Sequence, residues 1–117
     1  MEIIFYKQQN DRSPVHDFIK GLQPKDRLRI LACLKNVEEL GLDCPRVQFR
    51  QINGKLWEMK IKTACAGYRI FYVTLRKARM VLLHVYRKQS QKAPKREIEK
   101  AEKRMIEVLE NEELYNT

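Results

Sequence analysis

Apolar positions at the start of the chain predict a strand followed by a helix. Residues 2–7 (EIIFYK) are typical of a short strand. Ser13 before Pro14 is a common helix start, because the serine side chain caps free backbone N–H groups and proline fits the first helical position. Helical spacing then continues through Val15, Phe18, Ile19 and Leu22. We expect this helix to end near Gly21.

A second helix is predicted from Pro24 to Gly41. Glycine commonly closes a helix, and proline is tolerated in its first turn. The residues expected to form a broad buried face are Leu28, Ile30, Leu31, Leu34 and Val37. The two helices are therefore predicted to pair as an antiparallel hairpin.

After Pro45 the apolar period changes from helical to two, as in a strand. Within residues 55–62 (KLWEMKIK), Trp57, Met59 and Ile61 are expected on one face and Glu58, Lys60 and Lys62 on the other. Residues 68–75 (YRIFYVTL) and 80–87 (MVLLHVYR) are predicted as the next strands, separated by turns at 64–67 and 76–79. The segment is predicted to form a three-stranded antiparallel meander.

A final helix is expected to open at Pro94, with Ala93 as a poor cap. Its apolar stripe consists of Ile98, Ala101, Met105, Val108 and Leu109. The predicted order is β-α-α-β-β-β-α. This order is typical of an α+β fold, in one domain over residues 1–117.

Positive charge is concentrated on the predicted meander. The chain of 117 residues has a net charge of +9, but residues 51–96 alone hold 12 basic residues and one acid, or +11. Aromatic residues alternate with these cations, which suits a surface that binds phosphates and stacks bases, although a solvated lysine-rich surface has the same composition. We therefore predict an RNA partner. No apolar window is long enough to span a membrane, and three cysteines without C-x-x-C spacing favour a reducing cytoplasm.

Three cations of the meander form the candidate catalytic group. Lys60 and Lys62 share a strand face, and a four-residue turn at 64–67 would place Lys62 opposite Arg69, whereas a loop one residue shorter would flip that pairing. Crowded cations lower a lysine pKa, so one lysine becomes a plausible general base, and arginine can hold a phosphate. Such groups suit metal-free RNA cleavage, in which a 2′-OH attacks its own 3′-phosphate. The alternative is that these lysines simply face water.

Further residues are expected at the edge of this group. His84, Tyr86 and Lys88 share a face of the last strand, whereas Arg87 should point to the other face until the strand ends. A histidine in an apolar strand is more often packed or hydrogen-bonded than catalytic. With two histidines and no ligand spacing, we predict neither a metal site nor a cofactor.

Three motifs stand out together in the second half of the chain: Gly54–Lys62 (GKLWEMKIK), Gly67–Tyr72 (GYRIFY) and Val81–Lys88 (VLLHVYRK), followed by Pro94 at the start of the last helix. In combination they resemble the RelE/ParE superfamily of toxins, and in particular its HigB-like, phage-derived branch. The resemblance implies a RelE-like microbial ribonuclease-type fold. It also implies the toxin of a type II toxin–antitoxin system, a ribosome-dependent mRNA endonuclease neutralised by a helix-turn-helix antitoxin.

The resemblance assigns roles to individual residues. It gives catalytic roles to Lys60, Lys62, Arg69 and Lys88. Charge and position along the chain, apart from the resemblance, predict RNA-binding roles for Lys55, His84, Tyr86, Arg87 and Lys92. Gln89 replaces a second lysine of the family pattern, and Arg87 would supply that charge if the chain turns there. Two alternatives stay open: a ParE-like toxin that inhibits gyrase by binding, and a degenerate, non-toxic nucleic-acid-binding module.

Overall fold

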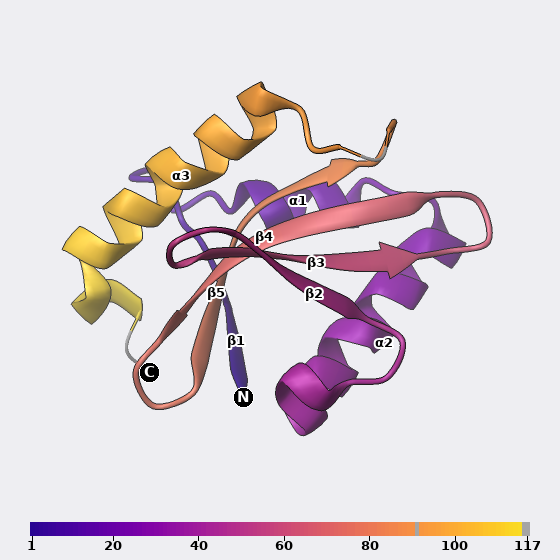
Figure 1. Ribbon diagram of the computed structural model, residues 1–117, viewed down its shortest axis with the longest axis horizontal. Helices are drawn as coiled ribbons and strands as arrows, with labels where there is room; N and C mark the ends of the chain where they lie inside the picture. The colour runs from indigo at the N-terminus through magenta and orange to yellow at the C-terminus, as the bar shows by residue number, and fades with distance from the viewer. Residues whose placement is uncertain (91, 116–117) are drawn as a thin grey trace.

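One mixed five-stranded sheet with helices on both faces forms the fold (Figure 1). The computed structural model describes residues 1–90 and 92–115. The strands are β1 (Glu2–Phe5), β2 (Gln48–Asn53), β3 (Leu56–Lys62), β4 (Gly67–Leu75) and β5 (Arg79–Arg87). The helices are α1 (Pro14–Lys20), α2 (Pro24–Leu40) and α3 (Lys95–Glu110), with short 3-10 turns η1 (Gly41–Asp43) and η2 (Glu112–Tyr115). The α+β fold class is confirmed.

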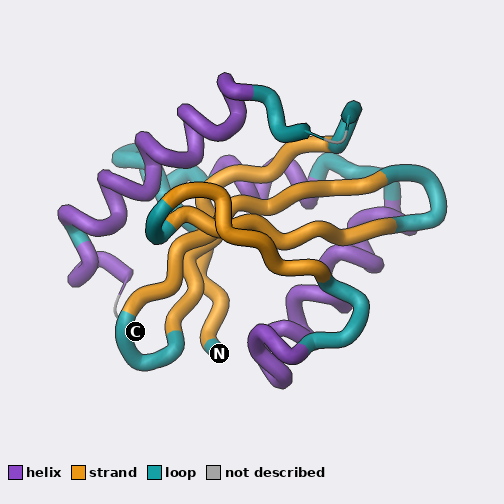
Figure 2. Tube along the Cα trace, in the orientation of Figure 1, coloured by secondary structure: helices purple, strands orange, loops and turns teal. Residues whose placement is uncertain are grey.

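The sheet has the order β1-β5-β4-β3-β2. Strand β1 runs parallel to β5, and β2 to β5 form a continuous antiparallel series, whose hairpins are visible in Figure 2. The predicted meander of three strands therefore has a fourth, β2. Periodicity did not reveal β2 because its sequence, QFRQIN, is mostly polar and it lies at the sheet edge, where few of its side chains are buried.

The helical hairpin begins and ends where the sequence predicted. The backbone N–H of His16 donates to Ser13 Oγ at 3.4 Å, Pro14 occupies the first turn of α1, and Gly21 caps its end. Gly41 ends α2 with a φ of 64°, a backbone conformation that favours glycine. The prediction that Leu28 and Leu31 are buried is wrong: they are 64% and 43% exposed, because α2 packs only through its Ile30, Leu34 and Val37 side.

Two separate apolar cores lie on the two faces of the sheet. Helices α1 and α2 cover one face, where Val15, Ile30 and Val37 pack against Met59, Ile61 and Ile70. On the other face, which we call the α3 face, Ala101 and Val108 of α3 pack against Phe71, Val73, Val81 and Leu83. The alternation predicted for β3 is confirmed, since Met59 and Ile61 belong to the first core.

Helix α3 begins one residue later than predicted, at Lys95, and Pro94 rather than Ala93 is its N-cap. Proline has no side-chain acceptor, so only its carbonyl contributes, accepting from Glu97 at 3.0 Å and Ile98 at 3.2 Å. The predicted apolar stripe is confirmed, with Ala101 and Val108 fully buried. Among the described residues, no helix is long and apolar enough to cross a membrane.

Candidate nucleic-acid site

Three rows of side chains cross the α3 face near the β3–β4 turn. The strand register aligns Arg50, Glu58, Phe71 and His84 in the first row and Gln48, Lys60, Arg69 and Tyr86 in the second. In the third row Lys62 faces Gly67, whose carbonyl accepts the backbone N–H of Lys88 at 2.8 Å. All four predicted catalytic residues thus lie in the second and third rows.

The register of the β3–β4 hairpin differs from the predicted one by two residues. Lys60 faces Arg69, and Lys62 faces Gly67, so the expected pairing of Lys62 with Arg69 is wrong. The cause is Thr63, which belongs to the turn: its Oγ1 accepts the backbone N–H groups of Cys65 at 3.2 Å and Ala66 at 3.0 Å. A shift of two residues keeps every side chain on its predicted face, so the three cations still share one face.

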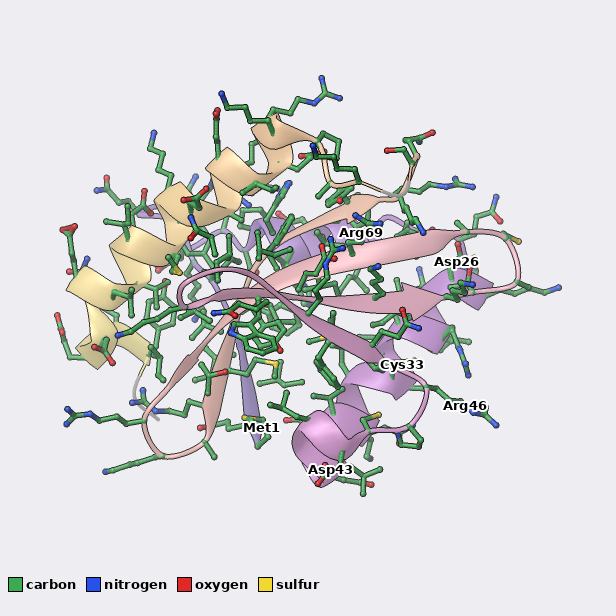
Figure 3. All side chains as sticks on the ribbon, in the orientation of Figure 1. Met1, Asp26, Cys33, Asp43, Arg46 and Arg69 are labelled. Atoms are coloured by element: carbon green, nitrogen blue, oxygen red, sulfur yellow. The ribbon has the colours of Figure 1, made fainter. Side chains whose placement is uncertain are left out.

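Arg69 is fully buried, at 0% exposure. Its Nη1 donates to Tyr86 Oη at 3.3 Å and its Nη2 to the Ser90 carbonyl at 3.4 Å. Figure 3 shows this side chain projecting from β4. The sequence led us to expect a guanidinium open to a phosphate; instead, the charge lies beneath the surface, fixed by the end of β5 and the segment after it.

Lys60 is half-buried, and its pKa is lowered. Burial is the largest cause, followed by repulsion from Arg50, Arg69 and, less strongly, Lys88, while the Glu58 carboxylate opposes the shift. A lysine in such surroundings gives up its proton more easily than one in water, as a general base requires.

Arg50 and Glu58 also belong to the site, although no motif in the sequence marks them as site residues. Arg50 Nη2 lies 2.9 Å from Glu58 Oε1, and the Glu58 side chain is completely buried whereas that of Arg50 is 48% exposed. Glu58 was placed on the correct face, but alternation alone gave no sign of burial. One feature of the sequence could have drawn attention to Glu58: it is the single acidic residue among the 13 charged residues of 51–96.

Lys62 and Lys88 flank an open cavity of about 440 Å³ beside the β3–β4 turn. Lys62 is exposed and Lys88 half-buried, and the Lys88 side chain lies over Gly67. The cavity is also lined by Cys65, Gln89 and Ser90. Gln89, which replaces the family's second lysine, is therefore at the site but brings no charge to it.

His84 is packed under α3 and does not offer a surface to RNA. Its Nε2 lies 2.8 Å from Glu97 Oε1, and Arg104 Nη1 donates to its Nδ1 at 3.3 Å. Because an arginine N–H can only donate, Nδ1 is the acceptor and Nε2 carries the proton, which describes a neutral imidazole. Burial lowers its pKa, and Glu97 opposes that shift. The packed, hydrogen-bonded interpretation of His84 is the one that fits.

The remaining predicted RNA-binding residues are dispersed. Arg87 pairs with Tyr68 and acts electrostatically on Asp26 of α2, so it faces the α1/α2 side and does not replace the charge missing at Gln89. Lys55 lies in the β2–β3 turn, five residues from Lys60, or roughly 17 Å along a strand. Tyr86 is buried as a partner of Arg69, and Lys92 is exposed beyond β5.

Within residues 1–90 and 92–115, no three histidine, cysteine, aspartate or glutamate side chains gather where they could hold a metal ion. The three cysteines are free thiols, of which Cys65 is exposed. The side chains that the second and third rows bring together include Lys60, Lys62, Lys88, Arg69 and Tyr86.

Comparison with known families identifies the class of protein. The family described as phage-derived protein Gp49-like (DUF891) matches residues 17–106, which include the second half of α1, all of α2, the meander and most of α3. The chain therefore belongs to this family, whose members are RelE/HigB-type toxins of toxin–antitoxin systems, so an antitoxin is its expected partner. No curated protein matches the chain.

Proposed function

We propose that this protein is a metal-free mRNA endonuclease that cleaves mRNA on the translating ribosome. The observation that carries the proposal is the direct pairing of Lys60 with Arg69 on the α3 face, where burial and neighbouring cations lower the Lys60 pKa. A basic, partly desolvated surface with a lysine of lowered pKa suits a reaction in which a 2′-OH loses its proton beside a phosphate.

In the proposed mechanism neutral Lys60 accepts the proton of the 2′-OH. The oxygen then attacks the adjacent phosphorus and a cyclic phosphate forms as the bond from phosphorus to the 5′-oxygen of the next nucleotide breaks. The leaving 5′-oxygen takes up a proton from water, and protonated Lys60 returns its proton to solvent. Lys62 and Lys88 lie at the cavity mouth and would neutralise the phosphate. Buried Arg69 would act through space, because a fixed charge in a poorly hydrated environment interacts strongly with developing negative charge.

The test is cleavage of mRNA on purified ribosomes, with the cut positions mapped by primer extension. Wild-type protein is expected to cut the mRNA at defined codon positions. Lys60→Met is expected to lower the single-turnover rate by about a hundred-fold or more, the range that a general base contributes. Lys35→Met, which removes an exposed lysine from α2 on the opposite side of the sheet, is the matched control and should cleave like wild type.

Growth arrest with intact mRNA and impaired DNA supercoiling would contradict the proposal and favour the gyrase-binding alternative. The Arg69→Ala substitution alone does not decide the matter, because it removes a buried side chain together with its charge. Arg69→Lys keeps the charge but loses the hydrogen bonds that the guanidinium makes to Tyr86 and Ser90. Its cleavage rate is therefore compared with its thermal unfolding curve, which shows whether the variant is folded.

A further inference from the structure

The Arg50–Glu58 ion pair is unusual because one partner is inside the protein and the other is at its surface. Glu58 has no exposed side-chain area, and its nearest cation is Arg50 Nη2 at 2.9 Å. The two groups form a close ion pair, but the contact does not have the geometry of a hydrogen bond. On the β4 side Glu58 pairs with Phe71, a buried residue of the α3-face core.

Stability alone gives little reason for such a pair. Burying a carboxylate costs several kcal/mol, and an apolar pair of similar volume is often as stable or more so. Glu58 also raises the pKa of Lys60 and of Tyr86, which places it electrostatically among the second-row residues. An acid kept in a segment of 12 cations, at the cost of desolvation, indicates a role in ordering those cations.

The exposure of the two arginines shows which of them faces the ligand. Arg69 is 0% exposed and is held by Tyr86 and Ser90, whereas the Arg50 side chain is 48% exposed on the same face. Arg50 precedes Arg69 and Lys88 among the cations that lower the Lys60 pKa, so it is electrostatically close to the proposed base. Guanidinium groups bind phosphate through paired N–H donors, and about half of the Arg50 side chain is open to solvent, where a phosphate can reach it.

We propose that Arg50 binds a backbone phosphate of the RNA on the β2 side of Lys60, and that buried Glu58 is the positioning residue that fixes its guanidinium there. This rests on the proposed function, since it takes the polyanion to be the RNA substrate. The bound RNA would then run across the rows, from Lys62 and Lys88 past Lys60 to Arg50, with a nonscissile phosphate at Arg50.

A second explanation of Glu58, that it only cancels excess positive charge, predicts the opposite result. Glu58→Gln raises the net charge by one, so under charge cancellation RNA binding becomes tighter. If Glu58 orients Arg50, binding becomes weaker although the protein is more positive. The sign of the change therefore separates the two explanations.

The experiment measures binding of fluorescently labelled protein to ribosomes programmed with an mRNA whose codon region is 2′-O-methylated and cannot be cleaved. Arg50→Gln is expected to weaken binding about ten-fold, as for loss of one charge-assisted contact. Glu58→Gln should weaken it in the same direction, and the double variant should be no weaker than Arg50→Gln. Arg76→Gln, an exposed arginine in the β4–β5 turn, is the control and should bind like wild type.

A methylphosphonate scan, which neutralises one phosphate of the codon region at a time, locates the contact. At one nonscissile position wild type should lose affinity while Arg50→Gln and Glu58→Gln lose none. Tighter binding by Glu58→Gln, or equal losses for wild type and Arg50→Gln at every position, would overturn the proposal.

Arg50→Lys keeps the charge at an exposed position and leaves Glu58 in place, so it tests the guanidinium even if Glu58→Gln does not fold. It is expected to bind more weakly than wild type, and unchanged binding would overturn the role of the guanidinium. Cleavage of the unmodified codon by wild type is measured in parallel. If wild type does not cleave, the proposed function fails; if it cleaves and the Arg50 variants bind normally, only this inference fails.

Discussion

At the scale of single residues, burial divides the cations of the site into different kinds. Lys62 is exposed, Lys60 is half-buried with a lowered pKa, and Arg69 is completely buried. Residue type and strand alternation placed all three on one face, but they do not determine depth. The burial of each side chain decides which cation can accept a proton, which can contact a phosphate directly, and which acts only through its electric field.

The pH dependence of cleavage provides a test of Lys60 as the base. Because only the neutral amine accepts a proton, the single-turnover rate at saturating protein should rise with pH and level off below the ordinary lysine pKa of about 10.4. Arg50→Gln removes a cation that lowers the Lys60 pKa, so its profile should move to higher pH, whereas the Arg76→Gln profile should not move. An unshifted Arg50→Gln profile would contradict the assignment.

At the scale of elements, a polar network fixes α3 to the sheet beside the site. Glu97, in the first turn of α3, is hydrogen-bonded to His84 of β5. Arg104, about two turns further along α3, donates to the Leu83 carbonyl at 3.0 Å. Arg104 also lies over the Tyr6 ring, 5.3 Å from its centroid. Tyr6 in turn donates to Glu107. Because His84 lies next to Phe71 and Tyr86, this network also supports the second row of the site.

Stability should therefore depend on the charge state of His84. Its folded-state pKa lies below the unfolded value of about 6.5, so below that pH the unfolded chain binds a proton more readily. The stability contribution is complete above about pH 6.5 and is lost as the pH falls. The urea midpoint of wild type should fall between pH 7.5 and pH 5 more steeply than that of His84→Gln. His16→Gln, at an exposed histidine, should retain the wild-type slope, and equal slopes for all three proteins would contradict the prediction.

At the scale of the whole molecule, topology decides where the excess charge acts. The +11 of residues 51–96 is distributed over both faces and both ends of the sheet. Lys60, Lys62 and Lys88 gather near the β3–β4 turn, Arg87 faces the helical hairpin, and Lys55 lies at the opposite end of β3.

Removing one lysine at each end of β3 tests this division. Lys62→Gln and Lys55→Gln lower the net charge equally, and both positions are exposed. Lys62→Gln should weaken binding to programmed ribosomes and reduce the salt dependence by about one phosphate contact, whereas Lys55→Gln should leave both unchanged. Equal losses in the two variants would show that only overall charge matters.

The helices, three of the four meander strands and the shared face of Lys60, Lys62 and Arg69 could all be predicted from the amino-acid sequence. These features depend on local spacing and caps, such as Ser13–Pro14 for α1 and the alternation of Met59 and Ile61 in β3. Resemblance of short motifs also indicated the toxin family that residues 17–106 match.

The register of Lys60 with Arg69, the parallel pairing of β1 with β5, and the burial of Arg69 and Glu58 became known from the folded chain alone. The register depends on a side-chain bond inside one turn, made by Thr63. Burial depends on elements distant in the sequence, since Arg50 from β2 and Ser90 after β5 meet Glu58 and Arg69 only in the folded sheet. Period and charge describe neighbours along one strand, whereas the depth of a charge is set by the strands and helix packed around it.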